Sequence, residues 1–375
     1  PLRIASFIWE RVPFPISARY LSSLSSCAKA FHPFRYNCFI IIPKDRAYSE
    51  GKSIWDIGIF MKKSILFGLM LVLMLTHPVW VTEGARCGLL LWYRAVVPAL
   101  FPFLVLSTLI VAEGGIDLLV RPLWRLLHPL FSLSIEGCYV LASGLLCGCP
   151  VGAKTCADFF KEGRIPMWEA RVLLAVCNHP SPMFLAGYVC PLLPKEIGIH
   201  KVLISVYLPV LILMIAAKRI YFTKETGLEG KTYTEISSVS LDASILSAAE
   251  LLCKIGGYLI IFSIMIVFLE NTTHLPFSLR IFLIGATEIT TGIHQITKSF
   301  KGITAACGSV AAFCFGGLSG LFQTRSVIAP ANGKAMSWIE KNAGLSIRQY
   351  FFWKLIHAAL AAGLMYLFIA AENGL

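Results

Sequence analysis

Charged side chains are scarce in this sequence, and acidic ones are the scarcest. Only 14% of the 375 residues are charged, and 21 residues in all are Asp or Glu, whereas a soluble domain carries about 25% charged residues. Hydrophobic residues make up 57% of the chain. The shortage of charge argues against an ordinary soluble domain and predicts an all-α polytopic integral membrane protein.

The positive net charge of +12 does not indicate a nucleic-acid partner. The Lys and Arg residues lie mostly in short segments between apolar runs, where they act as topology signals. We therefore expect the lipid bilayer as the main partner of the chain and no nucleic acid.

Catalytic and metal-binding motifs are also lacking. The sequence contains no H-E-x-x-H, G-x-S-x-G or phosphate loop, so we expect no enzyme and no catalytic residues. An intramembrane enzyme acting on a lipid-linked precursor is the least favoured class. The 12 Cys and eight His residues show no C-x-x-C or paired His spacing, so we expect no metal site and no cofactor.

No methionine occurs before Met61, and residues 1–60 show no sustained helical or strand period. From Met61 onward, two lysines precede an apolar run, as is typical of the start of a bacterial inner-membrane protein. We predict that Met61 is the true start and that residues 1–60 are translated upstream sequence. The alternative is a real but disordered extension.

Apolar runs of spanning length follow Met61. A spanning helix needs about 20 apolar residues, and 121–131 instead suits an interfacial helix. We expect eight to nine membrane segments, some broken or re-entrant, at 64–81, 88–112, 137–149, 168–193, 201–217, 248–269, 281–296, 304–322 and 350–371. The run 137–149 is too short to span and predicts a re-entrant segment.

A polar loop at 223–243 separates two membrane halves, 61–222 and 244–375. Basic residues place this loop in the cytoplasm. Each half has a long helix, a short helix with polar interruptions and a Gly-rich one, which predicts an internal duplication. Transporters often consist of two such halves, whose discontinuous helices meet at the bilayer midplane.

The first interruption is "GCPVGAK", residues 148–154. Gly148, Pro150 and Gly152 break the helix, and the freed backbone groups must face protein or water in a cavity. Lys154 would be costly facing lipid, so it either faces that cavity or reaches the surface. A plain helix end with a cytoplasmic lysine is the alternative.

The second interruption is "NHPSP", residues 178–182. Pro180 and Pro182 unwind the helix. Asn178 and Ser181 supply donors and acceptors there, which could bind the polar edges of a small ligand. The alternative is a loop that joins two helices.

The third interruption, "EITTG", begins at Glu288 and ends at Gly292. Glu288 is the acidic residue of an otherwise uncharged segment, and an ionisable residue within a membrane helix predicts a functional site. It could bind a cation, a proton or a ligand. The alternative is a pairing with Lys154 or with backbone at a helix contact.

The fourth interruption, "FGGLSG", is rich in glycine. Gly316 and Gly317 permit close helix approach. Ser319 and Gln323 are four residues apart, so both lie on one helical face, and we count them among the candidate binding residues. The alternative is that this motif serves packing only.

Together these motifs resemble the YlbJ family of sporulation integral membrane proteins, which belongs with the nucleoside-recognition or Gate-domain membrane proteins. The resemblance runs from about residue 64 to the end. It rests on LFPFLVLSTLI, SGLLCGCPVGAKTCADFFKEGRI, EARVLLAVCNHPSPMFLAGYV, EITTGI and FGGLSGLFQ. It implies a multi-pass protein in the mother-cell or forespore membrane of an endospore former, with a role in building the spore, particularly its cortex.

The resemblance also implies which positions carry the family motifs. Family members commonly have an aromatic residue at Cys149 and a polar one at Pro180, so the chain departs from the pattern there. The implied motif positions are Gly148, Pro150, Gly152, Ala153, Asn178, Ser181, Pro182, Glu288, Gly292, Gly316, Gly317, Ser319 and Gln323.

From these features we expect a channel or transporter-like protein for a small polar solute or nucleoside. Asn178 and Ser181 would contact the solute, and Glu288 would carry a cation or proton. Lys154 would mark the cytoplasmic mouth or balance the charge of Glu288. The alternative is a non-transporting scaffold for cortex assembly that recruits other sporulation proteins.

Overall fold

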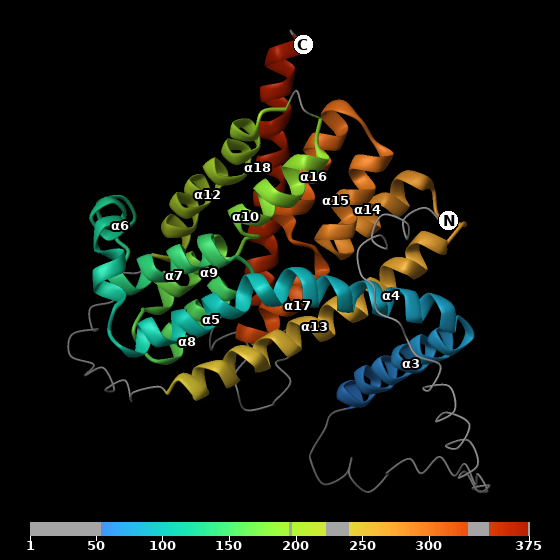
Figure 1. The fold of residues 1–375 in the computed structure, drawn as a ribbon, viewed down its shortest axis with the longest axis horizontal. Helices are drawn as coiled ribbons and strands as arrows, with labels where there is room; N and C mark the ends of the chain where they lie inside the picture. The colour runs from blue at the N-terminus through green and yellow to red at the C-terminus, as the bar shows by residue number, and fades with distance from the viewer. Residues whose placement is uncertain (1–53, 195–196, 223–239, 329–344, 374–375) are drawn as a thin grey trace, which may run out of the picture. The chain divides into compact units, whose positions relative to one another are not determined.

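The computed structural model describes residues 54–194, 197–222, 240–328 and 345–373. All regular elements in those ranges are helices (Figure 1), which confirms the all-α prediction. The chain forms two compact units, 1–70 and 71–375, and the packing described below concerns the second. Most of the predicted extension and most of the polar loop lie outside the described residues, so both stay predictions.

Helix α3 (Ile54–Thr76) begins ahead of Met61. The helix therefore includes residues 54–60, the last part of the stretch whose sequence shows no sustained period. The hypothesis of a start at Met61 is not decided by this helix.

Five helices in the described ranges are long and apolar enough to cross a membrane. A sixth span results if α6 (Ile116–Phe131) and α7 (Ile135–Cys147), which are bent by 106°, count as one. The chain is therefore a multi-pass integral membrane protein. The five are α4–η2–α5 (Pro78–Leu91, Trp92–Val96, Val97–Ala112), α12 (Ile199–Tyr221), α13 (Leu241–Asn271), α16–α17 (Gly302–Phe315, Gly317–Ile328) and α18 (Ile347–Asn373).

The predicted span 64–81 is not among the five, since it is divided between the end of α3 and the start of α4, and only Phe67–Thr76 of α3 counts as a shorter apolar helix. Two other predicted membrane segments consist of shorter helices. Segment 168–193 contains α9 (Met167–Val176), α10 (Pro182–Phe184), η3 (Leu185–Val189) and α11 (Cys190–Leu192). Segment 281–296 is divided between α14 (Phe277–Thr287) and α15 (Ile289–Ser299). These stretches belong to the broken and re-entrant types that the sequence predicts.

Two pairs of short helices form hairpins. Helix α7 packs against α8 (Val151–Lys161), and a Cβ atom on Gly152 would lie 2.7 Å from the Cα atom of Gly144. Helices α14 and α15 repeat this arrangement, since a Cβ on Gly292 would lie 2.5 Å from Gly285 Cα. Glycine at both crossings lets the backbones touch. Each hairpin returns the chain toward the side from which it entered, as a re-entrant segment does.

Two further elements are interrupted partway along. Between α9 and α10 the residues Cys177–Ser181 are not helical. Between α16 and α17 the chain turns at Gly316 and Gly317, whose φ angles are +82° and +69°. These left-handed backbone angles require glycine.

Apart from α3 and α6, the described helices of the two halves follow the same order. Each half has a long helix, a hairpin, an interrupted element and a second long helix, which are α4–α5, α7–α8, α9–α11 and α12 in the first half and α13, α14–α15, α16–α17 and α18 in the second. Helix α13 packs along α4 and α5, and α12 packs against α18. The matching order supports the predicted duplication, whose origin in one ancestral half stays a prediction.

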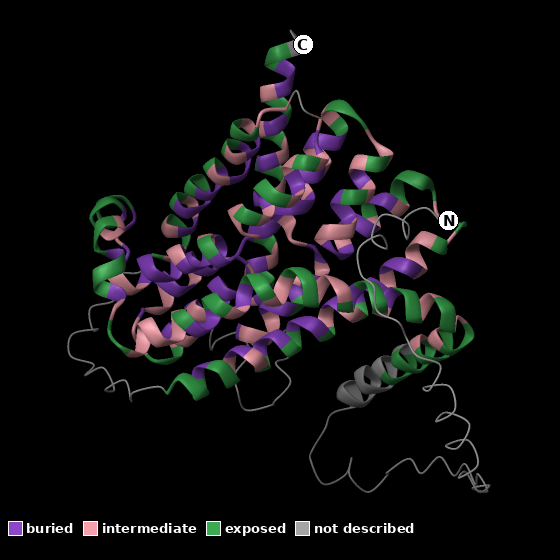
Figure 2. Cartoon of the chain, in the orientation of Figure 1, coloured by how far each residue is buried: buried purple, intermediate pink, exposed green. Residues whose placement is uncertain are grey.

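Buried residues gather where the hairpins and interrupted helices meet (Figure 2). The outward faces of the long helices are apolar and exposed, as Leu211 and Ile215 on α12 and Leu367 on α18 illustrate. Exposed apolar surface of this extent marks contact with a membrane.

Candidate solute-binding cavity

All four predicted helix breaks meet at one cavity of about 180 Å³. Five of the six residues predicted to bind a ligand line it together: Asn178, Ser181, Glu288, Ser319 and Gln323. Of the predicted break residues, Pro180 and Gly316 also line it. The lining residues with a polar or titratable side chain are Cys147, Cys149, Asn178, Ser181, Glu288, Thr290, Ser319, Gln323, Tyr350 and Lys354.

The remaining lining side chains are almost all apolar. Most of them come from the long helices α4–η2–α5 and α13, which pack along each other, and these include Leu91, Val96, Leu100, Ile255 and Leu259. An apolar wall with a few convergent polar groups is typical of small-molecule sites. The cavity therefore suits a small solute that has both an apolar body and a polar group.

Asn178 joins three elements at the centre of the site. Its side-chain amide nitrogen donates hydrogen bonds to Thr324 Oγ1 at 2.7 Å and to the Tyr350 hydroxyl at 2.9 Å. The same nitrogen lies 3.5 Å from Cys149 Sγ. Asn178 is 1% exposed, yet its Oδ1 atom has no hydrogen-bond partner within the described residues. This buried acceptor is available to a ligand.

Lys354 is the cation of the cavity. It is 1% exposed, and its Nζ atom donates to the backbone carbonyl oxygen of Asn178 at 3.3 Å. Among the ion pairs of the described ranges none involves Lys354. An ammonium group has three donors, so donors remain for whatever fills the cavity.

Lys354 and Tyr350 were not predicted as site residues, because residues 350–371 have the sequence pattern of an uninterrupted membrane helix. The signal was present, since Lys354 interrupts an apolar run. An ionisable residue inside a membrane helix is a functional hypothesis by default, and that rule applies to Lys354 as it does to Glu288.

Glu288 forms the tip of the α14–α15 hairpin. It is 2% exposed, and its two carboxylate oxygens accept from the backbone nitrogens of Thr290 at 3.0 Å and Thr291 at 2.8 Å. A carboxylate at a helix N-terminus satisfies free amides and complements the helix dipole. The backbone pairing that the sequence offered as an alternative is the contact that the structure shows.

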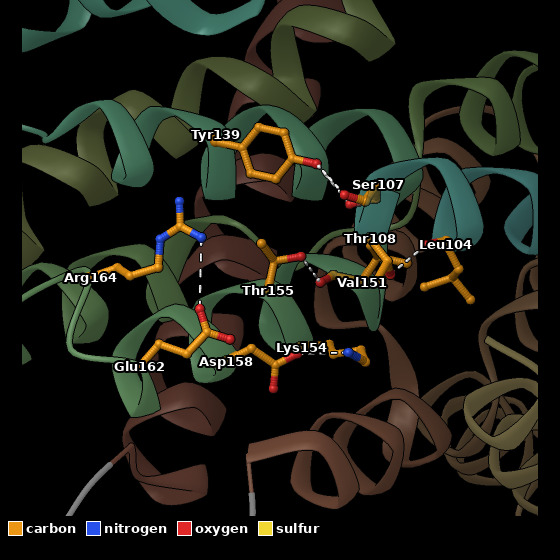
Figure 3. A network of polar contacts seen from close by, with 10 residues as sticks. All are labelled: Leu104, Ser107, Thr108, Tyr139, Val151, Lys154, Thr155, Asp158, Glu162 and Arg164. Atoms are coloured by element: carbon orange, nitrogen blue, oxygen red, sulfur yellow. Dashed lines mark hydrogen bonds and ion pairs between the residues drawn. The ribbon is translucent and has the colours of Figure 1, made fainter. Parts of the chain in front are cut away.

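Lys154 does not reach the cavity or Glu288. Its Nζ atom donates to Asp158 Oδ2 at 2.7 Å, one turn further along α8. Figure 3 shows this pair within a polar network between α5, α7 and α8, which also contains the bond between the Tyr139 and Ser107 hydroxyls. Residues four apart on a helix are close enough to pair. Asp158 therefore balances the charge of Lys154, which is the role that the sequence predicted for Glu288.

The other candidate binding residues form hydrogen bonds with residues three or four positions away on the chain. Gln323 donates to Ser319 Oγ at 3.0 Å, so the residues predicted to share a helical face are in contact. Ser181 Oγ accepts from the backbone nitrogen of Phe184 and caps α10, with Pro182 as the first helical residue. Ser181, Ser319 and Gln323 all line the cavity.

The remaining break residues set the backbone geometry around the cavity. Gly148 has a φ angle of +86°, and Pro150 precedes α8. A Cβ on Gly317 would lie 3.0 Å from the carbonyl oxygen of Thr287, so glycine is needed where α17 meets the hairpin tip. Within the described ranges, no cluster of three or more His, Cys, Asp or Glu residues could hold a metal ion.

Among known proteins, the chain is similar to a sporulation integral membrane protein. No family model matches the chain, and no solved structure matches it. The sporulation integral membrane protein YlbJ of Bacillus subtilis (strain 168) is 27% identical over 211 residues, which are 51% of this chain and 52% of that protein. The chain thus spans about half the length of this relative, and its similarity to a sporulation integral membrane protein confirms the family resemblance that its motifs indicated.

Proposed function

We propose that this chain is a transporter which moves a small anionic solute across a membrane during endospore formation. The observation that carries the proposal is a buried lysine, Lys354, in a cavity where two hairpins and two interrupted helices meet. Discontinuous helices that meet at a central site are typical of transporters. The link to sporulation, and to the spore cortex in particular, comes from the relative's name and from the family resemblance.

The charge of the solute is inferred from the charges around the cavity. An ammonium group buried without a carboxylate is costly, and the anionic group of a solute would supply the missing partner. Helix N-termini add to this preference, because α8 begins at Val151 without a side-chain cap and α17 begins at Gly317. Both ends lie beside cavity residues, Cys149 and Gly316, and helix N-termini favour anions.

Each wall of the cavity then has a role. Lys354 neutralises the anionic group, and Asn178 and Ser181 contact the polar part of the solute. The apolar wall from α4–α5 and α13 covers its body. Glu288 closes the hairpin tip, and its carboxylate keeps the N-terminus of α15 from competing for the anion.

Proteoliposome flux tests this proposal. Benzenesulfonate is a suitable probe because it is permanently anionic and has a small apolar body, and uridine is its uncharged counterpart. We expect the full chain to take up labelled benzenesulfonate and Lys354→Met to lose that uptake. Lys254→Met is the matched control, because Lys254 is exposed on α13 and paired with Glu250.

Two results would overturn the proposal in different ways. Uptake of uridine that is unaffected by Lys354→Met would favour an uncharged nucleoside as the solute. Uptake of neither probe by the full chain, together with a copurifying sporulation protein, would favour the non-transporting scaffold.

A further inference from the structure

Two buried histidines lie beside the cavity and have no part in the proposed binding of the solute. His179 is 1% exposed and His357 is 0% exposed. Their ring centroids are 5.0 Å apart, and the ring planes meet at 71°. His179 stands between Asn178 and Pro180, which both line the cavity. The pair therefore joins the α9–α10 break to α18 directly beside the site.

The hydrogen bonds of the pair leave ring nitrogens free. His357 Nε2 lies 2.9 Å from the carbonyl oxygen of Val206, and a carbonyl can only accept, so Nε2 carries the proton and Nδ1 is a lone-pair acceptor. His357 Nδ1 has no partner within the described residues, and the ring of His179 faces the backbone of Val176 without forming a full hydrogen bond. Buried polar atoms are rarely left unpaired, and an unpaired imidazole nitrogen can accept a proton.

The charges around the pair oppose a proton as long as the cavity is empty. Lys354 lies one turn before His357 on α18 and bonds the carbonyl of Asn178, next to His179. Apart from this lysine, the titratable groups near the cluster within the described residues are the thiols of Cys149, Cys177 and Cys314 and the hydroxyls of Tyr207 and Tyr350. The carboxylate of the cavity, Glu288, is already bonded to backbone amides. A second positive charge therefore needs an anion from outside.

We propose that the His179–His357 pair takes up one proton when an anion occupies the cavity, so that solute and proton cross the membrane together. This inference rests on the proposed function. The proton comes from water on the side of entry, adds to an unpaired ring nitrogen and returns to water when the anion leaves. By linkage, the anion must then bind more tightly as the pH falls.

Calorimetric titration of the full chain in lipid nanodiscs tests the coupling. Benzenesulfonate does not titrate near neutral pH, so any proton taken up on binding belongs to the protein. Titrations in buffers of different ionisation enthalpy count those protons. We expect about one proton per bound anion and an affinity that rises by up to about tenfold per unit of falling pH.

Glutamine variants identify the acceptor. Gln keeps an N–H donor at both positions, for Val206 at position 357 and for the backbone of Val176 at position 179. His357→Gln and His179→Gln should therefore both fold. We expect each variant to bind benzenesulfonate with little or no proton uptake and with an affinity that no longer depends on pH. His294→Gln, at an exposed position, should behave as the unchanged chain does.

The outcomes separate the two proposals. Undiminished proton uptake in both Gln variants would overturn the assignment to the histidines. Binding of the anion by the unchanged chain without proton uptake would overturn the coupling and leave the anion transporter standing. Failure of the unchanged chain to bind benzenesulfonate would overturn the proposed function, and the coupling with it.

Discussion

The Nζ atom of Lys354 lies 3.3 Å from the backbone carbonyl oxygen of Asn178. The Tyr350 hydroxyl, one turn earlier on α18, accepts from the side chain of the same Asn178 at 2.9 Å. Two bonds thus fix the last helix of the second half to the broken element of the first half. The contact between the halves and the cationic wall of the cavity are made by the same residues.

Replacing Lys354 should separate function from stability. Lys354→Met removes a buried charge that has no carboxylate partner and puts a side chain of similar volume in its place. The desolvation cost of the ammonium group is then no longer paid in the folded state. We expect an unchanged or higher Tm in detergent, together with at least about tenfold weaker binding of benzenesulfonate. A clearly lower Tm than that of Lys254→Met would show instead that the lysine holds the fold.

Asn178 should show energetic coupling to Tyr350. Asn178→Ala leaves two buried hydroxyls without their donor, and a lost buried hydrogen-bond partner costs about 1–3 kcal/mol. A double-mutant cycle with Tyr350→Phe should give a coupling energy of at least about 0.5 kcal/mol. The exposed Asn271→Ala is the control, and it should change the free energy of unfolding by less than about 0.5 kcal/mol. Additive effects of Asn178→Ala and Tyr350→Phe would contradict the bond.

The hairpin crossings should not tolerate a methyl group. A Cβ on Gly152 would lie 2.0 Å from the carbonyl oxygen of Cys177, so Gly152→Ala must push two backbones apart. Overpacking of this kind costs about 1–3 kcal/mol or more. Gly257→Ala is the control, because nothing lies within 4 Å of its added Cβ. We expect a clear loss of folded yield on size-exclusion chromatography for Gly152→Ala alone, and equal yields would contradict the close approach.

The positions of the helix breaks could be predicted because proline and glycine act locally. Pro180 and Pro182 lie two residues apart and together favour a break, although single prolines such as Pro102 and Pro209 lie within helices of this structure. Gly316 permits a left-handed backbone in any fold. The pairing of Gly144 with Gly152 could not be predicted, since it depends on α8 folding back on α7. The sequence therefore predicts where helices stop, and not which way the chain turns afterwards.

The charges illustrate the same limit. Lys154 and Glu288 are prominent in the sequence, and a pairing between them was a reasonable expectation. In the structure each has a local partner, Asp158 for the lysine and the amides of Thr290 and Thr291 for the glutamate. The lysine that lines the cavity is Lys354, and only the packing of α18 against the α9–α10 break brings it there.

Glu288→Gln distinguishes a capping carboxylate from a charge carrier. The amide oxygen of Gln can still accept one of the two backbone bonds, so we expect a loss of stability of about 0.5–2 kcal/mol with the proton uptake per anion unchanged.

The biological readout is the heat-resistant spore count of Bacillus subtilis lacking YlbJ and carrying this chain, with protein levels checked by immunoblot. We expect Glu288→Gln to restore most of the spores that the unchanged chain restores, and Lys354→Met to restore few. If Glu288→Gln fails as completely as Lys354→Met at equal protein levels, the carboxylate itself carries charge during transport, and the histidine pair is not the sole proton site.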